Sequence, residues 1–499
     1  MKIVLLPLDE RPCNGLYPNE LPLKEGITLV VPPRTLLSNK KEVCDISLLN
    51  KWLIEECKDA DYALLALDTL LYGGIVPSRL HHEDYETLIK RSENLQVLKQ
   101  NNPKLKIFVN ELIMRTPSYS NATEEPDYFD NYGKELWQYG YYLDKEKQGI
   151  ITKNEKRKMD VLYNYIPNEF LTDLMNRREI NRRVTIHNLN YVKSGVIDYF
   201  IIPQDDCAPF GFTSIDRREI NKFLVEQGLD EKIVTYPGAD EAGMVLISKA
   251  LNDYFKNTPK VYVKYACEEG KESIPEYEDR PIDASLSAHI HISGAIRTYE
   301  YEEADMVLAV NLAKEFLPMY DENIEKNLRD RDLESFVRFI KKAKEDGKVV
   351  GITDIAICNR GDMYLFKALQ SNNMLNSIDA YAGWNTASNS TGTTVAMMTA
   401  YYYSRDDEKK TYTLFCRYIE DFFYMGPIRD EINKIIDVHQ EWKVHIENLS
   451  YMNSVFVQLV EEKLDHTINF YKLKDIYNCQ DLSVYFPWNR TFEVAVVVK

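Results

Sequence analysis

The sequence lacks the long apolar runs that membrane insertion or secretion would require. None of its apolar segments approaches the roughly 20 residues that span a bilayer. The first apolar run, residues 3–6, is soon followed by Asp9 and Glu10, and it is too short for the hydrophobic region of a signal peptide. We therefore expect neither export nor membrane insertion.

Cysteine and histidine are scarce and scattered along the chain. The 499 residues include eight cysteines and eight histidines, and no Cys-x-x-Cys pair occurs. This pattern indicates neither a disulfide framework nor a zinc site built from thiolates. The simplest expectation is a cytoplasmic protein with reduced thiols, no cofactor and no metal ion.

Positively charged residues are also fewer than negatively charged ones. Lys and Arg number 61 against 78 Asp and Glu, so the formal net charge is −17. A protein that follows a phosphate backbone or docks on an anionic membrane needs a concentrated positive field. The strongest candidate for a basic segment, residues 153–158, is interrupted by Glu155 and indicates a solvated helix face. We expect a small-molecule partner, with no nucleic acid and no membrane; the oligomeric state is left open.

Apolar residues, by contrast, make up 44% of the chain, enough for a substantial core. Short runs rich in β-branched residues alternate with longer amphipathic stretches, which is typical of βα units around a buried parallel sheet. We predict an α/β fold with a (β/α) barrel-like parallel sheet. The expected strands are residues 3–6, 27–31, 62–67, 107–109, 199–202, 233–236, 261–265, 306–310, 349–352 and 378–381.

The strand signals stop near residue 405, which suggests two regions. Residues 1–405 are predicted to form an α/β catalytic domain, with a Tyr-rich helical insertion at about 116–197 and a possible internal boundary near 258. Residues 406–499 are predicted to be mainly helical, with helices over 412–423, 428–438 and 452–464 and a terminal strand over 493–498.

Polar side chains cluster directly after the predicted strands. Since the carboxyl ends of parallel strands lie on one side, residues far apart in the chain should converge on one cleft. The expected substrate-binding residues of this cleft are Asp9, Glu10, Arg11, Asp68, Tyr72, Arg79, Arg115, Gln204, Asp240, Glu241, Trp384, Asn385 and Asn389.

Asp205 and Asp206 are the candidate catalytic pair. They follow an apolar strand, and two adjacent carboxyl groups push their pKa values apart, so that one can hold a proton while the other stays charged. The alternative is structural: Asp206 caps the following turn and Asp205 pairs with an arginine.

The polar residues at other strand ends can also be interpreted either as binding residues or as structural ones. Asp240 and Glu241 open a predicted helix, where a carboxylate can cap the helix as readily as it can bind a substrate hydroxyl or a metal. Arg11 and Arg79 could hold a carboxylate by bidentate pairing, or simply link the rim of the sheet.

The segment 380–393 is dense in neutral hydrogen-bonding side chains around Trp384. An indole that stacks on a sugar ring, with the amides of Asn385 and Asn389 binding hydroxyl groups, would suit an uncharged polyhydroxylated ligand. The alternative is a helix cap next to a packed tryptophan.

His289 and His291 would lie on one face of a strand, as metal ligation requires. A lone His-x-His pair is a weak signal, and two histidines that bind no metal are the favoured interpretation.

At these motifs the sequence resembles a bacterial family known only as a domain of unknown function. The resemblance covers essentially the whole chain, and membership implies no established activity. It is carried by Pro-Leu-Asp-Glu-Arg-Pro-Cys-Asn at 7–14, Asp-Thr-Leu-Leu-Tyr-Gly-Gly-Ile-Val-Pro-Ser-Arg at 68–79, Pro-Gln-Asp-Asp at 203–206, Tyr-Pro-Gly-Ala-Asp-Glu at 236–241, Ala-Gly-Trp-Asn-Thr at 382–386 and Phe-Pro-Trp-Asn-Arg at 486–490.

A looser analogy concerns chemistry. If residues 27–31 are peripheral, Asp205 and Asp206 end the fourth barrel strand, a position similar to that of the carboxyl pair in glycoside hydrolases that cleave N-acetylated sugars by substrate-assisted catalysis. The resemblance implies that Asp205 orients the acetamido group or acts as a base, while Asp206 is the general acid.

The leading hypothesis is therefore a glycoside hydrolase acting on a small or N-acetylated sugar conjugate. Two alternatives stay open. One is a hydrolase or lyase in which Asp205, Asp206, Asp240, Glu241 and a histidine hold a divalent metal ion. The other is a carbohydrate-binding protein without catalytic activity.

Overall fold

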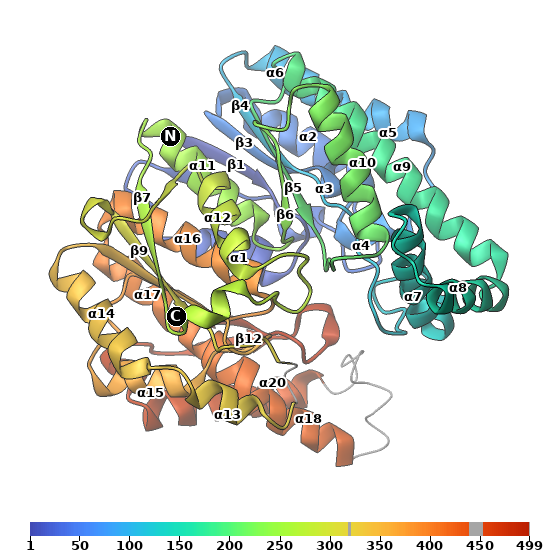
Figure 1. Ribbon diagram of the computed structural model, residues 1–499. Coiled ribbons are helices and arrows are strands. Elements are labelled where there is room, and N and C mark those ends of the chain that lie inside the picture. The colour runs from blue at the N-terminus through green and yellow to red at the C-terminus, as the bar shows by residue number, and fades with distance from the viewer. Residues whose placement is uncertain (318–320, 439–452, 499) are drawn as a thin grey trace. The chain divides into compact units, whose positions relative to one another are not determined.

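A computed structural model describes residues 1–317, 321–438 and 453–498 of the chain. It divides into two compact units, which are described separately (Figure 1). Unit 1 comprises residues 1–10, 26–246 and 277–279. Unit 2 comprises residues 11–25, 247–276 and the chain from Arg280 onward.

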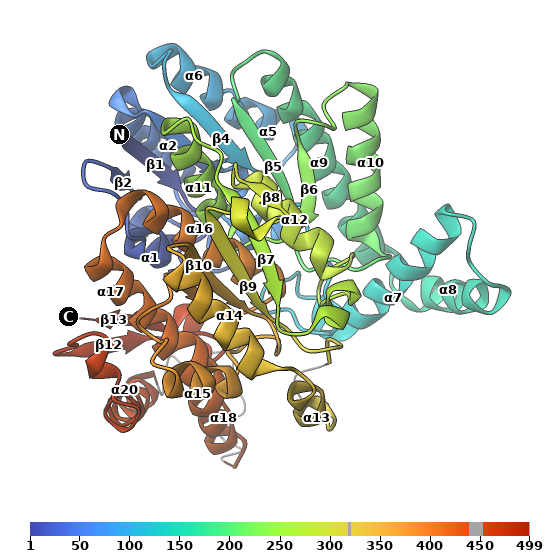
Figure 2. The same ribbon diagram turned by 60° about the vertical axis from the view of Figure 1, so that its left-hand side comes forward.

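Unit 1 is built on a six-stranded parallel sheet with the order β2-β1-β3-β4-β5-β6 (Figure 2). The first connection leads from β1 outward to β2, and the chain then returns to the other side of β1 and continues from β3 to β6. This reversal places the topological switch point between β1 and β3. The strands are β1 (Lys2–Leu6), β2 (Thr28–Val30), β3 (Tyr62–Ala66), β4 (Lys106–Asn110), β5 (Tyr199–Gln204) and β6 (Val234–Pro237).

The alternation of side chains along these strands explains the core of unit 1. Every second residue, such as Val4 and Leu6 on β1 or Phe200 and Ile202 on β5, faces one apolar cluster. Intervening residues such as Leu5 and Ile201 are buried on the opposite face. Burial on both faces accounts for the nearly continuous apolar runs in the sequence.

The helices of unit 1 include the predicted insertion. Helices α7, α8 and α9 occupy residues 129–193, and α7 and α8 pack against each other in a hairpin, drawn in teal in Figure 1. The helices are α2 (Ile46–Glu56), α3 (Leu67–Tyr72), α4 (Ile75–Leu80), α5 (Tyr85–Ser92), α6 (Asn94–Asn101), α7 (Phe129–Lys147), α8 (Lys153–Tyr165), α9 (Asn168–Lys193), α10 (Phe212–Glu226) and α11 (Ala242–Tyr254), within which the chain passes into unit 2.

Unit 2 contains a five-stranded parallel sheet with the order β11-β10-β9-β7-β8. Numbered along the chain within the unit, this order is 2-1-3-4-5, which is also the order of the first five strands of unit 1. The switch point of this sheet lies between β7 and β9. The strands are β7 (Lys260–Tyr265), β8 (Ile296–Thr298), β9 (Met306–Asn311), β10 (Val349–Asp354) and β11 (Ala380–Ala382).

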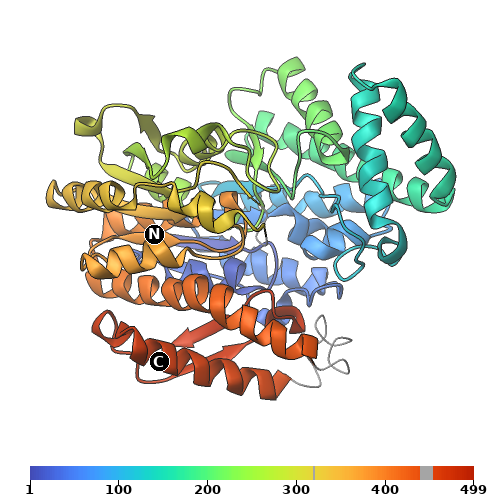
Figure 3. The ribbon, with the colours of Figure 1, turned by 60° about the horizontal axis from the view of Figure 1, so that its bottom comes forward.

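The helix α16 packs on this sheet and is buried over most of its length, because small and hydroxyl residues let it approach β10 closely. An antiparallel pair, β12 (Leu482–Tyr485) and β13 (Ala495–Val498), follows α20 in the chain (Figure 3). The helices are α1 (Pro12–Glu20), α12 (Ile282–Ile292), α13 (Ile324–Arg329), α14 (Leu333–Glu345), α15 (Met363–Ser371), α16 (Ala387–Ser404), α17 (Asp407–Arg417), the π-helix η5 (Tyr418–Ile428), α18 (Arg429–Val438) and α20 (Asn453–Phe470).

The α/β class and the parallel strands are confirmed, and all ten predicted runs overlap observed strands. The strands form two sheets, each with two edge strands, where the sequence suggested one barrel-like sheet. The sequence missed β8 and β12, which are short and partly exposed. In the described part of the chain, no helix has the length and apolar character that crossing a membrane requires.

Candidate functional site

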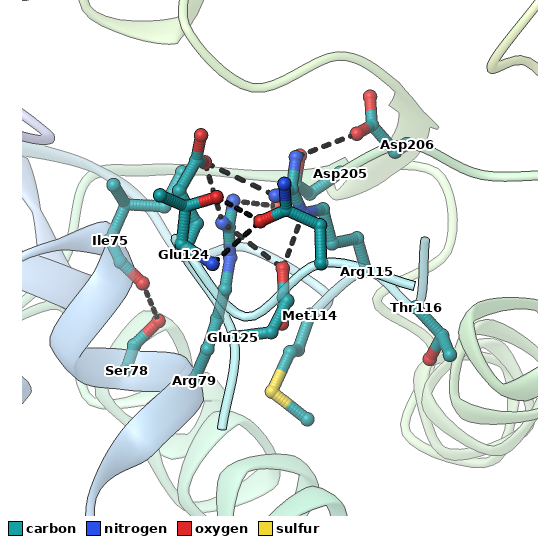
Figure 4. A network of polar contacts seen from close by, with 12 residues as sticks. Ile75, Ser78, Arg79, Met114, Arg115, Thr116, Glu124, Glu125, Asp205 and Asp206 are labelled. Carbon is teal, nitrogen blue, oxygen red and sulfur yellow. Dashed lines mark hydrogen bonds and ion pairs between the residues drawn. The ribbon is translucent and has the colours of Figure 1, made fainter. Parts of the chain in front are cut away.

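The predicted catalytic pair lies in a network of ion pairs in unit 1 (Figure 4). Arg79 Nη2 donates to Oδ2 of Asp205 at 2.6 Å, and Arg115 Nη1 donates to Oδ2 of Asp206 at 2.8 Å. Two further carboxylates, Glu124 and Glu125, contact both arginines at 2.8–3.5 Å. The two aspartates therefore have separate arginine partners that are joined through shared glutamates.

Three segments deliver these side chains. Asp205 and Asp206 follow β5, and Arg115 follows β4, so both come from the carboxyl edge of the sheet. Arg79 lies on α4, which begins after Gly74 at a φ of 145° that favours glycine. The two glutamates come from the connection between β4 and α7, which crosses this edge.

Asp206 is the most accessible carboxylate of the network, with 22% of its side chain exposed. Its backbone has a φ of 34°, an uncommon left-handed conformation for a residue other than glycine, and such strain is concentrated at functional sites. Burial raises the pKa of Asp206 to about 6. The positive charge of Arg115 opposes this rise, and the negative charge of Asp205 adds to it. At neutral pH a fraction of the Asp206 carboxyl groups is therefore protonated.

Asp205 and Asp206 each use only one carboxylate oxygen to bind the protein. Both ion pairs involve Oδ2, and no side chain or backbone group of the described residues donates a hydrogen bond to either Oδ1. The backbone N–H of Asp205 donates to the carbonyl of Ile113 at 3.2 Å, which fixes the start of this turn. The two arginines hold both carboxyl groups in place through a single oxygen of each.

A second group of acids lies at the ends of β3 and β4. Asp68 Oδ2 accepts the backbone N–H of Leu112 at 3.0 Å, and burial raises the pKa of Asp68 to about 6, with Asp205 contributing to the rise. Glu111 accepts hydrogen bonds from Thr185 and Asn188, both at 3.0 Å. Burial raises the pKa of Glu111 to about 8, with the charge of Asp68 adding to the effect.

The loops at the switch point are tied together. Thr69 Oγ1 donates to the carbonyls of Pro7 and Leu8 at 2.7 and 2.8 Å, which joins the end of β1 to the start of α3. Asp9 is buried in the first of these loops and Asp68 in the second. The sheet therefore brings together strand ends that are about 60 residues apart in the chain.

Glu10 joins two loops, and Glu241 stabilises the turn in which it lies. Glu10 accepts hydrogen bonds from Ser38 Oγ at 2.9 Å and from the backbone N–H of Lys40 at 2.8 Å. Glu241 accepts the backbone N–H of Ala239 at 3.0 Å, so it stabilises the turn that precedes α11. Asp240 beside it is buried.

Two other predicted residues are buried with polar atoms that have no partner in the described part of the chain. Neither amide atom of Gln204, at the end of β5, has a hydrogen-bond partner among the described residues, and the same is true of the Tyr72 hydroxyl. Buried polar groups without partners are uncommon in folded proteins, and functional sites are one setting where they occur. Burial raises the pKa of Tyr72 well above its usual range, and the nearby charges of Glu111 and Asp68 raise it further.

The remaining predicted residues belong to unit 2. The Arg11 guanidinium lies 4.4 Å from the centre of the Trp488 ring. Trp384 is 4% exposed, donates its indole N–H to Thr393 Oγ1 at 3.2 Å and meets the Tyr17 ring edge-on. Its indole is thus packed in the interior, as the structural alternative anticipated.

The segment after Trp384 caps α16. Thr386 is the N-cap residue, and its Oγ1 accepts the backbone N–H of Asn389. Asn385 has a φ of 53°, and its carbonyl accepts the backbone N–H of Asn359 at 2.8 Å.

The strand suggested for His289 and His291 is wrong, because both residues lie on α12. Positions i and i+2 of a helix point in different directions. His289 is accordingly buried, with Nδ1 at 2.8 Å from the carbonyl of Ser285, whereas His291 is exposed. Nowhere in residues 1–317, 321–438 and 453–498 do three or more His, Cys, Asp or Glu side chains form a group that could hold a metal ion.

Comparison with known proteins places the chain in a family. The family described as "Protein of unknown function (DUF4127)" matches residues 3–497. The chain belongs to this family. No curated protein matches the sequence.

The family match confirms the resemblance stated from the motifs but assigns no role to any residue. The barrel position used in the glycosidase analogy does not apply, because β5 lies in an open sheet, next to the edge strand β6. The pair of adjacent carboxyl groups is the only part of the analogy that still applies.

Sequence reasoning missed Glu124 and Glu125. They follow no strand, so the rule that selected polar residues at strand ends passed over them. Their signal was the composition of the loop: an adjacent acidic pair before Pro126, in a chain where Arg79 and Arg115 both needed partners.

Proposed function

We propose that this protein is a glycoside hydrolase acting on a small or N-acetylated sugar conjugate. Asp206 would be the general acid, and Asp205 would orient the acetamido group or act as a base. The observation that supports this proposal is that both carboxyl groups are anchored to arginines by Oδ2, while neither Oδ1 accepts a hydrogen bond from any residue that the structure describes.

The proposed chemistry needs two carboxyl groups with different roles. In the first step the acetamido oxygen of the substrate forms a bond to the anomeric carbon while the bond to the leaving oxygen breaks, and Asp206 transfers its proton to that oxygen. Water then opens the cyclic intermediate and returns a proton to Asp206. The exposure of Asp206 and its pKa of about 6 suit a group that gives up and regains a proton.

Asp205 suits the orienting role because Arg79 fixes its position. The Arg79–Asp205 ion pair is short, at 2.6 Å, and both side chains are almost fully buried. An anchored carboxylate can accept a hydrogen bond from an acetamido N–H through its second oxygen without moving, so little entropy is lost when the substrate binds.

The test is hydrolysis of a panel of 4-nitrophenyl glycosides, including N-acetylhexosaminides. We expect release of nitrophenol from at least one of them, and a fall in kcat of about 10²–10⁴ for Asp206→Asn with little change in binding. Asp173→Asn is the matched control, since Asp173 is also paired with an arginine, has a similar exposure of 28% and lies on α9 outside the network.

Each alternative has its own outcome in the same experiments. Well-folded protein that releases nitrophenol from no glycoside would contradict the hydrolase proposal. Sugar binding that Asp206→Asn leaves unchanged, without turnover, would favour a carbohydrate-binding protein. A stoichiometric metal ion, with loss of activity on chelation, would favour the metal-dependent alternative.

A further inference from the structure

The guanidinium of Arg115 holds a different carboxylate with each of its three nitrogens (Figure 4). Nε donates to Glu125 Oε1 at 2.8 Å, Nη2 to Glu124 Oε2 at 3.1 Å and Nη1 to Asp206 Oδ2 at 2.8 Å. A guanidinium is planar and presents its N–H groups in fixed directions. The position of one carboxylate therefore constrains where the other two can bind.

These contacts run from the interior of unit 1 toward its surface. The side chain of Glu125 is 4% exposed, that of Arg115 10% and that of Asp206 22%. Glu125 Oε1 also lies 3.5 Å from Arg79 Nη1, and Arg79 in turn holds Asp205. The most deeply buried carboxylate of the network thus contacts the arginine partners of both proposed catalytic residues.

The backbone that carries Glu125 and Arg115 is held by neighbouring helices. Three residues before Glu125, the N–H of Ala122 donates to Asp130 Oδ1 in the first turn of α7 at 2.7 Å. The residue after Glu125 is a proline, which restricts the backbone there. The carbonyl of Arg115 accepts a hydrogen bond from Nη1 of Arg178, on α9, at 3.0 Å. Both side chains therefore extend from fixed positions.

We propose that Glu125 is a positioning residue for the general acid: its carboxylate fixes the direction of the Arg115 guanidinium, and that guanidinium fixes the carboxyl group of Asp206. This inference rests on the proposed role of Asp206 as the general acid. Glu125 itself would not contact the substrate, because its side chain is almost fully buried.

The charge of Glu125 also bears on the proton of Asp206. Asp206 is faced by Arg115 and Tyr119 from the connection after β4, by Asp205 from its own turn and by Arg79 from α4. Burial has the largest effect on the pKa of Asp206, and Arg115, which lowers it, has the next largest. Since Glu125 compensates part of the charge of Arg115, it favours a proton on Asp206.

Two substitutions of Glu125 separate the effect of its charge from that of its length. Glu125→Gln keeps the length and an oxygen for Arg115 Nε but removes the negative charge. The positive charge of Arg115 is then less compensated, so the titration midpoint of Asp206 should fall by about one pH unit. Glu125→Asp keeps the charge, but its shorter side chain draws the guanidinium away from Asp206, so the midpoint should rise by about half a pH unit.

The midpoint is measured by ¹³C NMR of protein labelled at the aspartate carboxyl groups, with Asp206→Asn to assign the signal. Glu179→Gln is the matched control, since Glu179 also pairs with an arginine and is 49% exposed on α9; its midpoint should equal that of wild type. Shifts in opposite directions for the two Glu125 variants support the proposal. Unchanged midpoints, or shifts in the same direction, would overturn it. If only one of the variants folds, the direction of its shift decides.

The titration requires no turnover, so this proposal and the hydrolase proposal can fail separately. Where a glycoside is hydrolysed, the fall of kcat/KM at high pH should move with the midpoint of Asp206 in each variant, because a general acid must be protonated to act. Hydrolysis with an unmoved midpoint would overturn the positioning role alone. Shifted midpoints without hydrolysis of any glycoside would contradict the hydrolase proposal alone.

Discussion

Replacing Glu111 by glutamine is expected to remove a pH dependence from the stability of unit 1. The Glu111 side chain is almost fully buried and accepts hydrogen bonds from Thr185 and Asn188. Asn188 Oδ1 is buried without a partner among the described residues, so an N–H of glutamine at position 111 could reach an acceptor that is otherwise unused. Glutamine thus imitates the protonated acid in size, charge and hydrogen bonding.

The magnitude follows from the pKa of Glu111, which burial raises from 4.5 to about 8. Between these two pH values the folded protein holds a proton that the unfolded chain has released, so the free energy of unfolding decreases as the pH rises through this window. Applied to this single group, linkage gives a loss of about 2.5 kcal/mol between pH 5 and pH 7.

Urea unfolding of wild type and Glu111→Gln at pH 5, 6 and 7 measures this effect. We expect the difference in unfolding free energy between the two proteins to shift in favour of the variant by about 2–3 kcal/mol from pH 5 to pH 7. Glu169→Gln, which removes an exposed carboxyl group of α9, is the control for the substitution. A difference for Glu111→Gln that does not change with pH would refute the assignment of a raised pKa to Glu111.

Two further substitutions test how buried charge and backbone conformation contribute to stability. Arg417 is buried and pairs with Glu420 and Asp421. Arg417→Met should therefore leave two buried acids without this cation and lower the free energy of unfolding of unit 2 by about 3–5 kcal/mol. Urea unfolding measures this loss, and a loss below about 1 kcal/mol would contradict the prediction. Gly238 has a φ of 152°, and a Cβ at this position would lie 2.0 Å from Glu241 Oε1. Gly238→Ala should therefore lower the free energy of unfolding by about 1–3 kcal/mol. An unchanged melting temperature would show that the turn adapts to the added methyl group without cost.

The strands could be predicted because their signal is local. Runs such as residues 199–202 and 306–310 are apolar at every position, as strands buried on both faces must be, and both form strands. The helix α12 was missed because His289, Ile290, His291 and Ile292 alternate as the residues of a strand do. Ile282, Leu286 and Ile290 recur at the four-residue spacing of a helix, and all three are buried.

The candidate site was predictable in part for a similar reason. The rule that parallel strands share a carboxyl edge correctly placed Asp9, Asp68, Asp205 and Asp206 at one edge of one sheet. The catalytic and binding roles of these residues stay predictions. Their partners Glu124 and Glu125 could not be found in this way, because their positions depend on the path of a long connection.

The sequence by itself determined the class of the fold, the location of nearly every strand of the two parallel sheets and the family of the protein, because apolar periodicity and long motifs are properties of neighbouring residues. Only the tertiary structure decided that the strands divide between two open sheets, that Arg79 and Arg115 hold the two aspartates, and that Trp384 is packed inside unit 2. The pairing of strands and the burial of charges depend on contacts between residues up to hundreds of positions apart, and these contacts leave no local pattern in the chain.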